Sequence, residues 1–216
     1  MTKPLAHRRS RWREPKPEGF TLVEILVAVA ALTVISTMVV KTTGQSLRRE
    51  VLNSLTVDLY GWLEGVQRKA MSVDPSQRAA NPAAFPPCTV TFNTGTLTPG
   101  SVLAQTPAEC APGSQQRDGV AEFLLPNFNS KANFVVQTFN GNTVTFSPRG
   151  TVTFTDGAST NPLTGPFTIE ISREGGSLAR CLRMEPLLGF MAIGSLNNQN
   201  PSASQDCPEN SFDGVF

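Results

Sequence analysis

The feature that most constrains this chain is an apolar run, Phe20–Val40, that is long enough to cross a membrane. It holds 21 residues, of which 16 are apolar and one, Glu24, is charged. At 1.5 Å per residue, a helix of this length is roughly 32 Å long, about the thickness of the hydrocarbon core of a bilayer. An ionisable group inside a membrane segment costs at least about 2.5–3.5 kcal/mol and usually marks a function. Glu24 is therefore a candidate functional residue.

The charges on either side of this run predict its orientation. Residues 1–19 hold six Lys or Arg and two Glu, net +4, whereas residues 20–74 hold five of each sign. The positive-inside rule then places the N-terminus in the cytoplasm and the rest of the chain outside, as a single-pass membrane protein. A secretory signal peptide and a simple signal anchor are the alternatives. However, the run exceeds the 7–15 apolar residues of a signal peptide and contains a carboxylate.

The run begins with a recognisable motif. Gly19-Phe20-Thr21-Leu22-Val23-Glu24-Ile25-Leu26 resembles the class III signal of type IV prepilins and of type II secretion pseudopilins. The resemblance implies that prepilin peptidase removes the basic leader, residues 1–19, by cutting after Gly19. It implies that Phe20 becomes the first residue and is N-methylated, and that Glu24 guides assembly with other pilins. It also implies location in the inner (cytoplasmic) membrane and then in a pilus or pseudopilus. Glu18 departs from the family pattern, in which Lys is common.

Elementary electrostatics agrees with these roles. Cleavage before Phe20 would create an α-ammonium group at the start of a helix, and Glu24 lies four residues later on the same face. Neither charge is stable alone in an apolar environment. The carboxylate of one subunit could therefore neutralise the amine of its neighbour and set the axial register of a filament.

The composition argues against catalysis. His7 is the only histidine and lies in the leader, so a processed chain could form neither a Ser-His-Asp triad nor a histidine metal site. No cofactor or metal is expected. The nearest candidate for acid–base chemistry is the carboxylate pair Glu170 and Glu174, which we interpret as a solvated strand end. The chain is predicted to be structural and not an enzyme; a secreted enzyme with a signal peptide is the weaker alternative.

The helical pattern continues beyond the apolar run. Apolar residues recur at steps of three and four, which predicts an amphipathic face that packs on a sheet; they are Leu47, Val51, Leu55, Leu59, Trp62, Leu63, Val66 and Ala70. Asp74-Pro75 ends the pattern, because the residue before proline disfavours the α region. One helix over residues 20–74 is predicted, with the membrane-spanning part at 20–40.

Residues 75–216 change to short alternating runs typical of strands, with net charge −3 from seven basic and ten acidic residues. The predicted strands are Thr89–Phe92, Val120–Leu125, Asn133–Phe139, Asn142–Phe146, Thr151–Phe154, Pro166–Ser172, Leu178–Met184 and a last edge strand, Leu187–Ile193. Asn140-Gly141 predicts a type I′ hairpin between its neighbouring runs. The fold class is therefore α+β: a long N-terminal helix packed on an antiparallel head of about seven or eight strands.

The head carries a second resemblance. Phe146-Ser147-Pro148-Arg149-Gly150, followed by a strand and by the hairpin Phe167–Met184, resembles the GspH/FimT family of minor pilins and pseudopilins. Such subunits sit at the filament tip, and some bind DNA through C-terminal arginines. Here Arg180 and Arg183 fall on opposite faces of a strand, and every charged residue after Arg183 is acidic. DNA binding is therefore disfavoured, although a tip subunit that binds DNA or a surface ligand remains the alternative function.

The four cysteines, Cys88, Cys110, Cys181 and Cys207, all lie beyond the apolar run. An even number in an exported domain favours disulfides, and the absence of Cys-x-x-Cys argues against zinc. Of three possible pairings, we expect Cys88–Cys110 and Cys181–Cys207. The first would close a proline-rich loop, Ala83–Pro112, with little core of its own, and the second would hold a polar tail, Ser195–Asp213.

Overall fold

A computed structural model of the chain describes residues 21–72, 87–111, 116–117, 119–127, 132–157, 162–176, 178–197, 207 and 212, with backbone alone for 37–45, 116–117 and 197. The chain divides into two compact units, Met1–Gln45 and Ser46–Phe216. The predicted leader, Gly19 and Phe20 lie outside the described residues.

The single described helix, α1, spans Leu22–Ser72 and so begins in the first unit and ends in the second. Its bounds agree with the predicted helix as far as the described residues reach. Within those residues, no helical stretch combines the length and the apolarity that a membrane span requires. The membrane-spanning segment Phe20–Val40 therefore stays a prediction.

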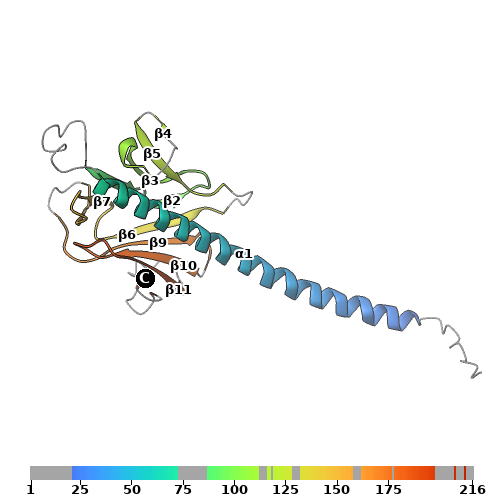
Figure 1. Cartoon of the computed structure of the whole chain (residues 1–216). Helices are drawn as coiled ribbons and strands as arrows, with labels where there is room; N and C mark the ends of the chain where they lie inside the picture. Colours follow the sequence, from blue (N-terminus) through green and yellow to red (C-terminus); the bar gives the residue numbers. More distant parts are fainter. Residues whose placement is uncertain are drawn as a thin grey trace, which may run out of the picture. The chain divides into compact units, whose positions relative to one another are not determined.

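The second unit contains two antiparallel sheets. The bounds of the first, sheet A, are β4 (Gln116–Arg117), β5 (Val120–Leu124), β3 (Val102–Pro107), β1 (Cys88–Phe92), β7 (Thr143–Phe146) and β8 (Val152–Thr155), in spatial order. Those of the second, sheet B, are β11 (Met191–Asn197), β10 (Leu178–Met184), β9 (Phe167–Arg173), β6 (Phe134–Phe139) and β2 (Gly95–Leu97). This arrangement confirms the mixed helix and antiparallel sheet class (Figure 1).

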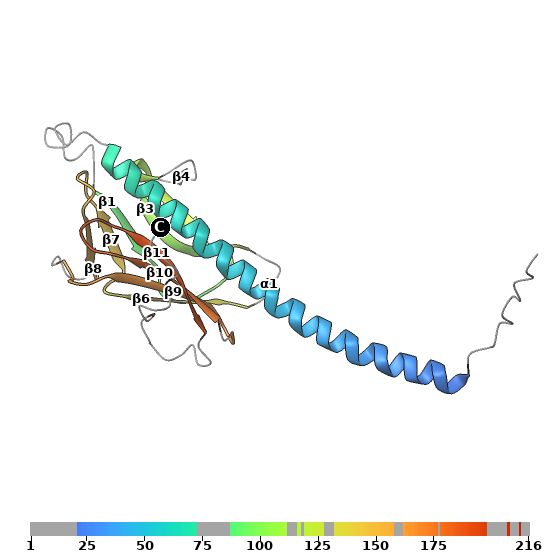
Figure 2. The same ribbon diagram turned by 60° about the horizontal axis from the view of Figure 1, so that its bottom comes forward.

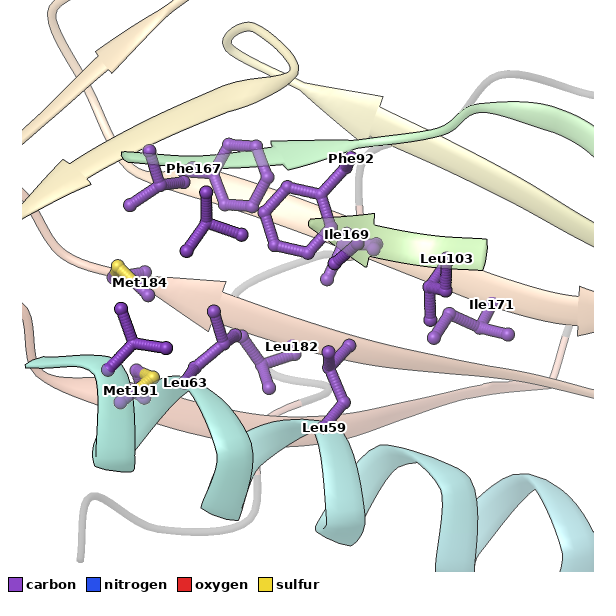
Figure 3. Close-up of a cluster of buried hydrophobic side chains, with 14 of the residues drawn as sticks. Leu59, Leu63, Phe92, Leu103, Phe167, Ile169, Ile171, Leu182, Met184 and Met191 are labelled. Atoms are coloured by element: carbon purple, nitrogen blue, oxygen red, sulfur yellow. The ribbon is translucent and has the colours of Figure 1, made fainter. Parts of the chain in front are cut away.

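The core of the second unit joins α1 to both sheets. Figure 3 shows Leu59 and Leu63 of α1 beside Phe92 and Leu103 of sheet A and Ile169, Ile171 and Leu182 of sheet B. The amphipathic face was predicted correctly in most positions. Leu47 is an error, because its side chain is 62% exposed, and Leu52, which the periodicity did not include, is buried.

The predicted hairpin at Asn140-Gly141 is wrong. Both residues have the left-handed conformation that a type I′ turn needs, with φ of 61° and 98°. However, β6 pairs with β9 and β2, whereas β7 pairs with β1 and β8, so the turn carries the chain from one sheet to the other. The Asn140 side chain donates to the Pro166 carbonyl (2.7 Å), and the N–H of Asn142 donates to the Thr155 carbonyl (3.0 Å). These long-range contacts replace the ladder between the two neighbouring runs.

Two other expectations also need correction. The supposed loop Ala83–Pro112 contains β1, β2 and β3, and it contributes Val90, Phe92 and Leu103 to the core. The last strand begins at Met191 and not at Leu187, because residues 186–188 form a turn and Leu187 has a φ of 70°. Short strands with interrupted alternation, such as Gly95–Leu97, gave no periodic signal over their length.

The structure forms two disulfides. Cys88, the first residue of β1, is joined to Cys110 at the end of the 3-10 turn η1 (Ala108–Cys110), with a Cα–Cα distance of 5.4 Å. Cys181 of β10 is joined to Cys207, with a Cα–Cα distance of 6.4 Å. These are the two pairs expected from the sequence, and they leave no free cysteine.

Candidate assembly site

The helix that carries Glu24 begins with a defined cap at Thr21. The N–H of Glu24 approaches both the Thr21 hydroxyl (3.3 Å) and the Thr21 carbonyl (3.0 Å), and the N–H of Ile25 donates to the same carbonyl (3.2 Å). Thr21 is thus the N-cap of α1. This role was missed in the sequence, although the spacing Thr-x-x-Glu before an apolar run is the signature of a capping box.

Glu24 lies in the first turn of α1, and its side chain is exposed. A carboxylate in this position is stabilised by the partial positive charge at the helix start, which contributes typically 0.3–1 kcal/mol. Glu24 therefore has two available roles: it can stabilise its own helix start, and it can face a cation from outside the chain. Its predicted partner, the amine of Phe20, lies outside the described residues.

The helix surface around Glu24 is apolar and exposed. Within Leu22–Ile35, the large aliphatic side chains all have more than half of their surface accessible; they are Leu22, Val23, Ile25, Leu26, Val27, Val29, Leu32, Val34 and Ile35. A contiguous apolar surface of this extent normally marks a site covered by protein or by membrane.

The hydroxyl groups on this segment can be buried against protein or lipid without losing their hydrogen bonds. The Thr33 hydroxyl donates to the Ala30 carbonyl (2.7 Å), and the Ser36 hydroxyl donates to the Leu32 carbonyl (2.7 Å). Because these hydroxyls bond within the helix, burying them leaves their donors satisfied. The carboxylate of Glu24 is then the group on this surface that most needs an external partner.

The other candidate carboxylates, Glu170 and Glu174, lie in different surroundings. Glu170 was expected at a solvated strand end, and this was wrong. Its side chain is buried, at 3% exposure, within β9, opposite Gln137 and Cys181. Glu174 lies in the following turn and accepts from the Asn133 amide (2.9 Å). The two carboxylates thus have different surroundings, and among the described residues no three possible ligands cluster as a metal site.

The two C-terminal arginines also lie apart. Arg180 is paired across the sheet with Ile171, whereas Arg183 is paired with Thr168, so the alternation of the strand places them on opposite faces. Arg183 forms an ion pair with Glu185 (2.7 Å), and its guanidinium lies over the ring of Phe212 (5.7 Å). These contacts do not produce a joint basic surface for the two residues.

Comparison with known proteins finds a match at the N-terminal part of the chain. Residues 16–40 match the prokaryotic N-terminal methylation motif. This match includes Gly19, Phe20, Thr21 and Glu24, and it supports a type IV pilin-like chain, structural in kind, of the sort that prepilin peptidase cleaves and that assembles with other pilins. No curated protein and no solved structure matches the chain.

Proposed function

We propose that this chain is a minor type IV pilin or pseudopilin. In this proposal, prepilin peptidase cuts after Gly19, Phe20 becomes the methylated N-terminus, and the segment Phe20–Val40 anchors the chain in the inner membrane. The chain then enters a pilus or a type II secretion pseudopilus as a structural subunit that serves assembly, priming or the tip.

One observation carries the proposal: the methylation motif coincides with an exposed apolar helix whose first turn holds a single carboxylate. An apolar helix start of this kind suits packing against identical or related helices. Within such packing, Glu24 can neutralise the amine of Phe20 in a neighbouring subunit. A simple membrane anchor would have no role for this carboxylate.

The minor GspH/FimT type is the finer part of the proposal. It is supported by the compact turn at Ser147–Thr151, where the Thr151 N–H donates to the Ser147 hydroxyl (3.1 Å), and by the β9–β10 hairpin that follows. DNA binding is not included, because Arg180 and Arg183 do not share a face.

The decisive experiment is to replace Glu24 by Gln and to measure the ratio of the protein in sheared filaments to that in membranes. Gln keeps the size and the capping-box chemistry but removes the charge. Removing one partner of a buried ion pair costs about 3–5 kcal/mol, so we expect the ratio to fall more than about tenfold. Intact mass should show that the variant still begins at Phe20.

Two control variants separate assembly from helix stability. Glu50→Gln removes an exposed carboxylate further along α1 and should leave the ratio unchanged. Thr21→Ala removes the cap, at a cost of about 1 kcal/mol, but keeps the charge. Equal losses for Thr21→Ala and Glu24→Gln would show that Glu24 only stabilises the helix start, and an unchanged ratio for Glu24→Gln would refute its assembly role.

A further inference from the structure

Three arginines of the second unit converge at one end of sheet B, on the side that faces α1. Arg180 of β10 is opposite Ile171 in the register, and Arg173 follows two residues later on the same face of β9. Such diagonal neighbours lie about 7–8 Å apart, within reach of long side chains. Arg48 lies one helical turn before the buried Leu52, on the same side of α1. Figure 2 shows β9 and β10 running beside α1.

Arg173 is the most buried of the three. Its side chain is 7% exposed, its guanidinium lies 5.3 Å from the centre of the Phe134 ring, and its Nη2 approaches the Ala132 carbonyl (3.4 Å). Burial lowers the pKa of Arg173, and the nearby charge of Arg48 lowers it further. Because a guanidinium stays protonated at neutral pH, like charges are held close together at this end of the sheet.

Arg180 adds a donor without an acceptor. Its Nε is buried and makes no hydrogen bond to any part of the chain that the structure describes. A buried donor that is left unsatisfied costs about 1–3 kcal/mol, so an acceptor placed beside it would recover that cost. Two other arginines of the described chain have carboxylate partners, in the pairs Arg68–Glu64 and Arg183–Glu185. Within the described residues, no such pair includes Arg48 or Arg180.

We propose that this arginine cluster (Arg48, Arg173 and Arg180) binds a phosphate-type oxyanion. Guanidinium groups match phosphate oxygens through paired hydrogen bonds, and Arg173 is already held in position by the Phe134 ring. A phosphate carries more charge and more acceptor oxygens than a carboxylate, and it therefore suits three converging cations better. The source could be free phosphate or the head group of an anionic phospholipid. The inference does not rest on filament assembly, because the cluster lies entirely in the second unit.

The test is isothermal titration calorimetry on the full chain in a neutral detergent. The probes are inorganic phosphate, dihexanoyl phosphatidylglycerol and, as a zwitterionic control, dihexanoyl phosphatidylcholine, with acetate at equal ionic strength. We expect inorganic phosphate to bind more tightly than acetate. We expect Arg48→Gln and Arg180→Gln each to weaken the binding of phosphate about tenfold, as for the loss of a charge-assisted hydrogen bond. Arg149→Gln, a change to an exposed arginine in the Ser147–Thr151 turn, should have no effect.

The two anionic probes distinguish the sources. Binding of phosphatidylglycerol above that of free phosphate, with no binding of phosphatidylcholine, would identify a lipid head group, and equal binding would identify a soluble anion. Arg48 is exposed, so Arg48→Gln keeps the test valid if Arg180→Gln does not fold. The proposal is overturned if the unmodified chain binds phosphate no better than acetate, or if Arg48→Gln binds it as tightly as the unmodified chain.

Discussion

At the scale of single residues, Gly141 shows how local conformation and long-range contact combine. Its φ of 98° is one that residues with a Cβ rarely adopt, and an added Cβ would overlap the carbonyl group of Thr155. Gly175 also has a positive φ, 70°, but nothing lies within 4 Å of the place where its Cβ would be. The two glycines therefore share the left-handed backbone conformation and differ in whether a Cβ would meet another part of the chain.

We predict that Gly175→Ala lowers the free energy of unfolding by about 1–2 kcal/mol, the cost of the left-handed conformation. Gly141→Ala should cost about 1–3 kcal/mol more, because overpacking against the backbone is added to that cost. Urea unfolding of the two variants tests the difference. Equal losses would mean that the approach of Thr155 contributes nothing.

Local spacing made the start of the helix predictable at this scale. Glu24 and the glycine before Phe20 form a motif within six residues, so no knowledge of the fold was needed. The conformation of Asn140-Gly141 was predictable for the same reason. Its pairing was not, because the acceptor of the Asn140 amide, the Pro166 carbonyl, is 26 residues away.

At the scale of elements, α1 in the second unit is held by its buried leucines. Leu59 is fully buried against both sheets, whereas Leu47, three turns earlier on the predicted face, is largely exposed. We predict that Leu59→Ala lowers the free energy of unfolding by about 2–5 kcal/mol, because it leaves a cavity in a packed core. Leu47→Ala should change it by less than about 0.5 kcal/mol. Chemical unfolding followed by near-ultraviolet circular dichroism measures both; similar losses would contradict the packing described for the helix.

The periodic elements were also the ones that the sequence predicted well. The 3.6-residue repeat located α1, and alternation located β1, β5, β9 and β10 to within one or two residues. Alternation could not reveal that the strands form two sheets, because sheet membership depends on partners far along the chain. β9 illustrates this limit. It is buried on both faces, with Thr168, Glu170 and Ser172 as enclosed as Phe167 and Ile169, although Glu170 was expected at a solvated strand end.

At the scale of the whole molecule, the second unit has its own core. Leu52 is the first buried residue of the described chain, and the described side chains of the first unit, residues 21–36, are all exposed. We predict that a chain beginning at Ser46 folds in water, with no free thiol and with a free energy of unfolding within about 1 kcal/mol of that of the full chain, since the side chains described before Ser46 are all exposed. Thermal unfolding and thiol labelling in denaturant provide the measurements. A non-cooperative transition would show that the unit depends on the residues before Ser46.

The passage of the chain between the two sheets has a consequence for folding kinetics. β1 belongs to sheet A, β2 to sheet B and β3 to sheet A again, and the chain returns to sheet B at β6 and to sheet A at β7. β2 has no partner until β6 is available, and Thr91 of β1 must wait for Thr143 of β7, 52 residues later. Closing such long loops costs chain entropy before the strand contacts form, and this cost slows folding. Neither sheet can therefore be completed before the other has begun to form. A nascent chain that stops before Val152 lacks β8 of sheet A and β9, β10 and β11 of sheet B. Almost all of the second unit must therefore be available before it can fold, and until then its unpaired strand edges are exposed to other chains.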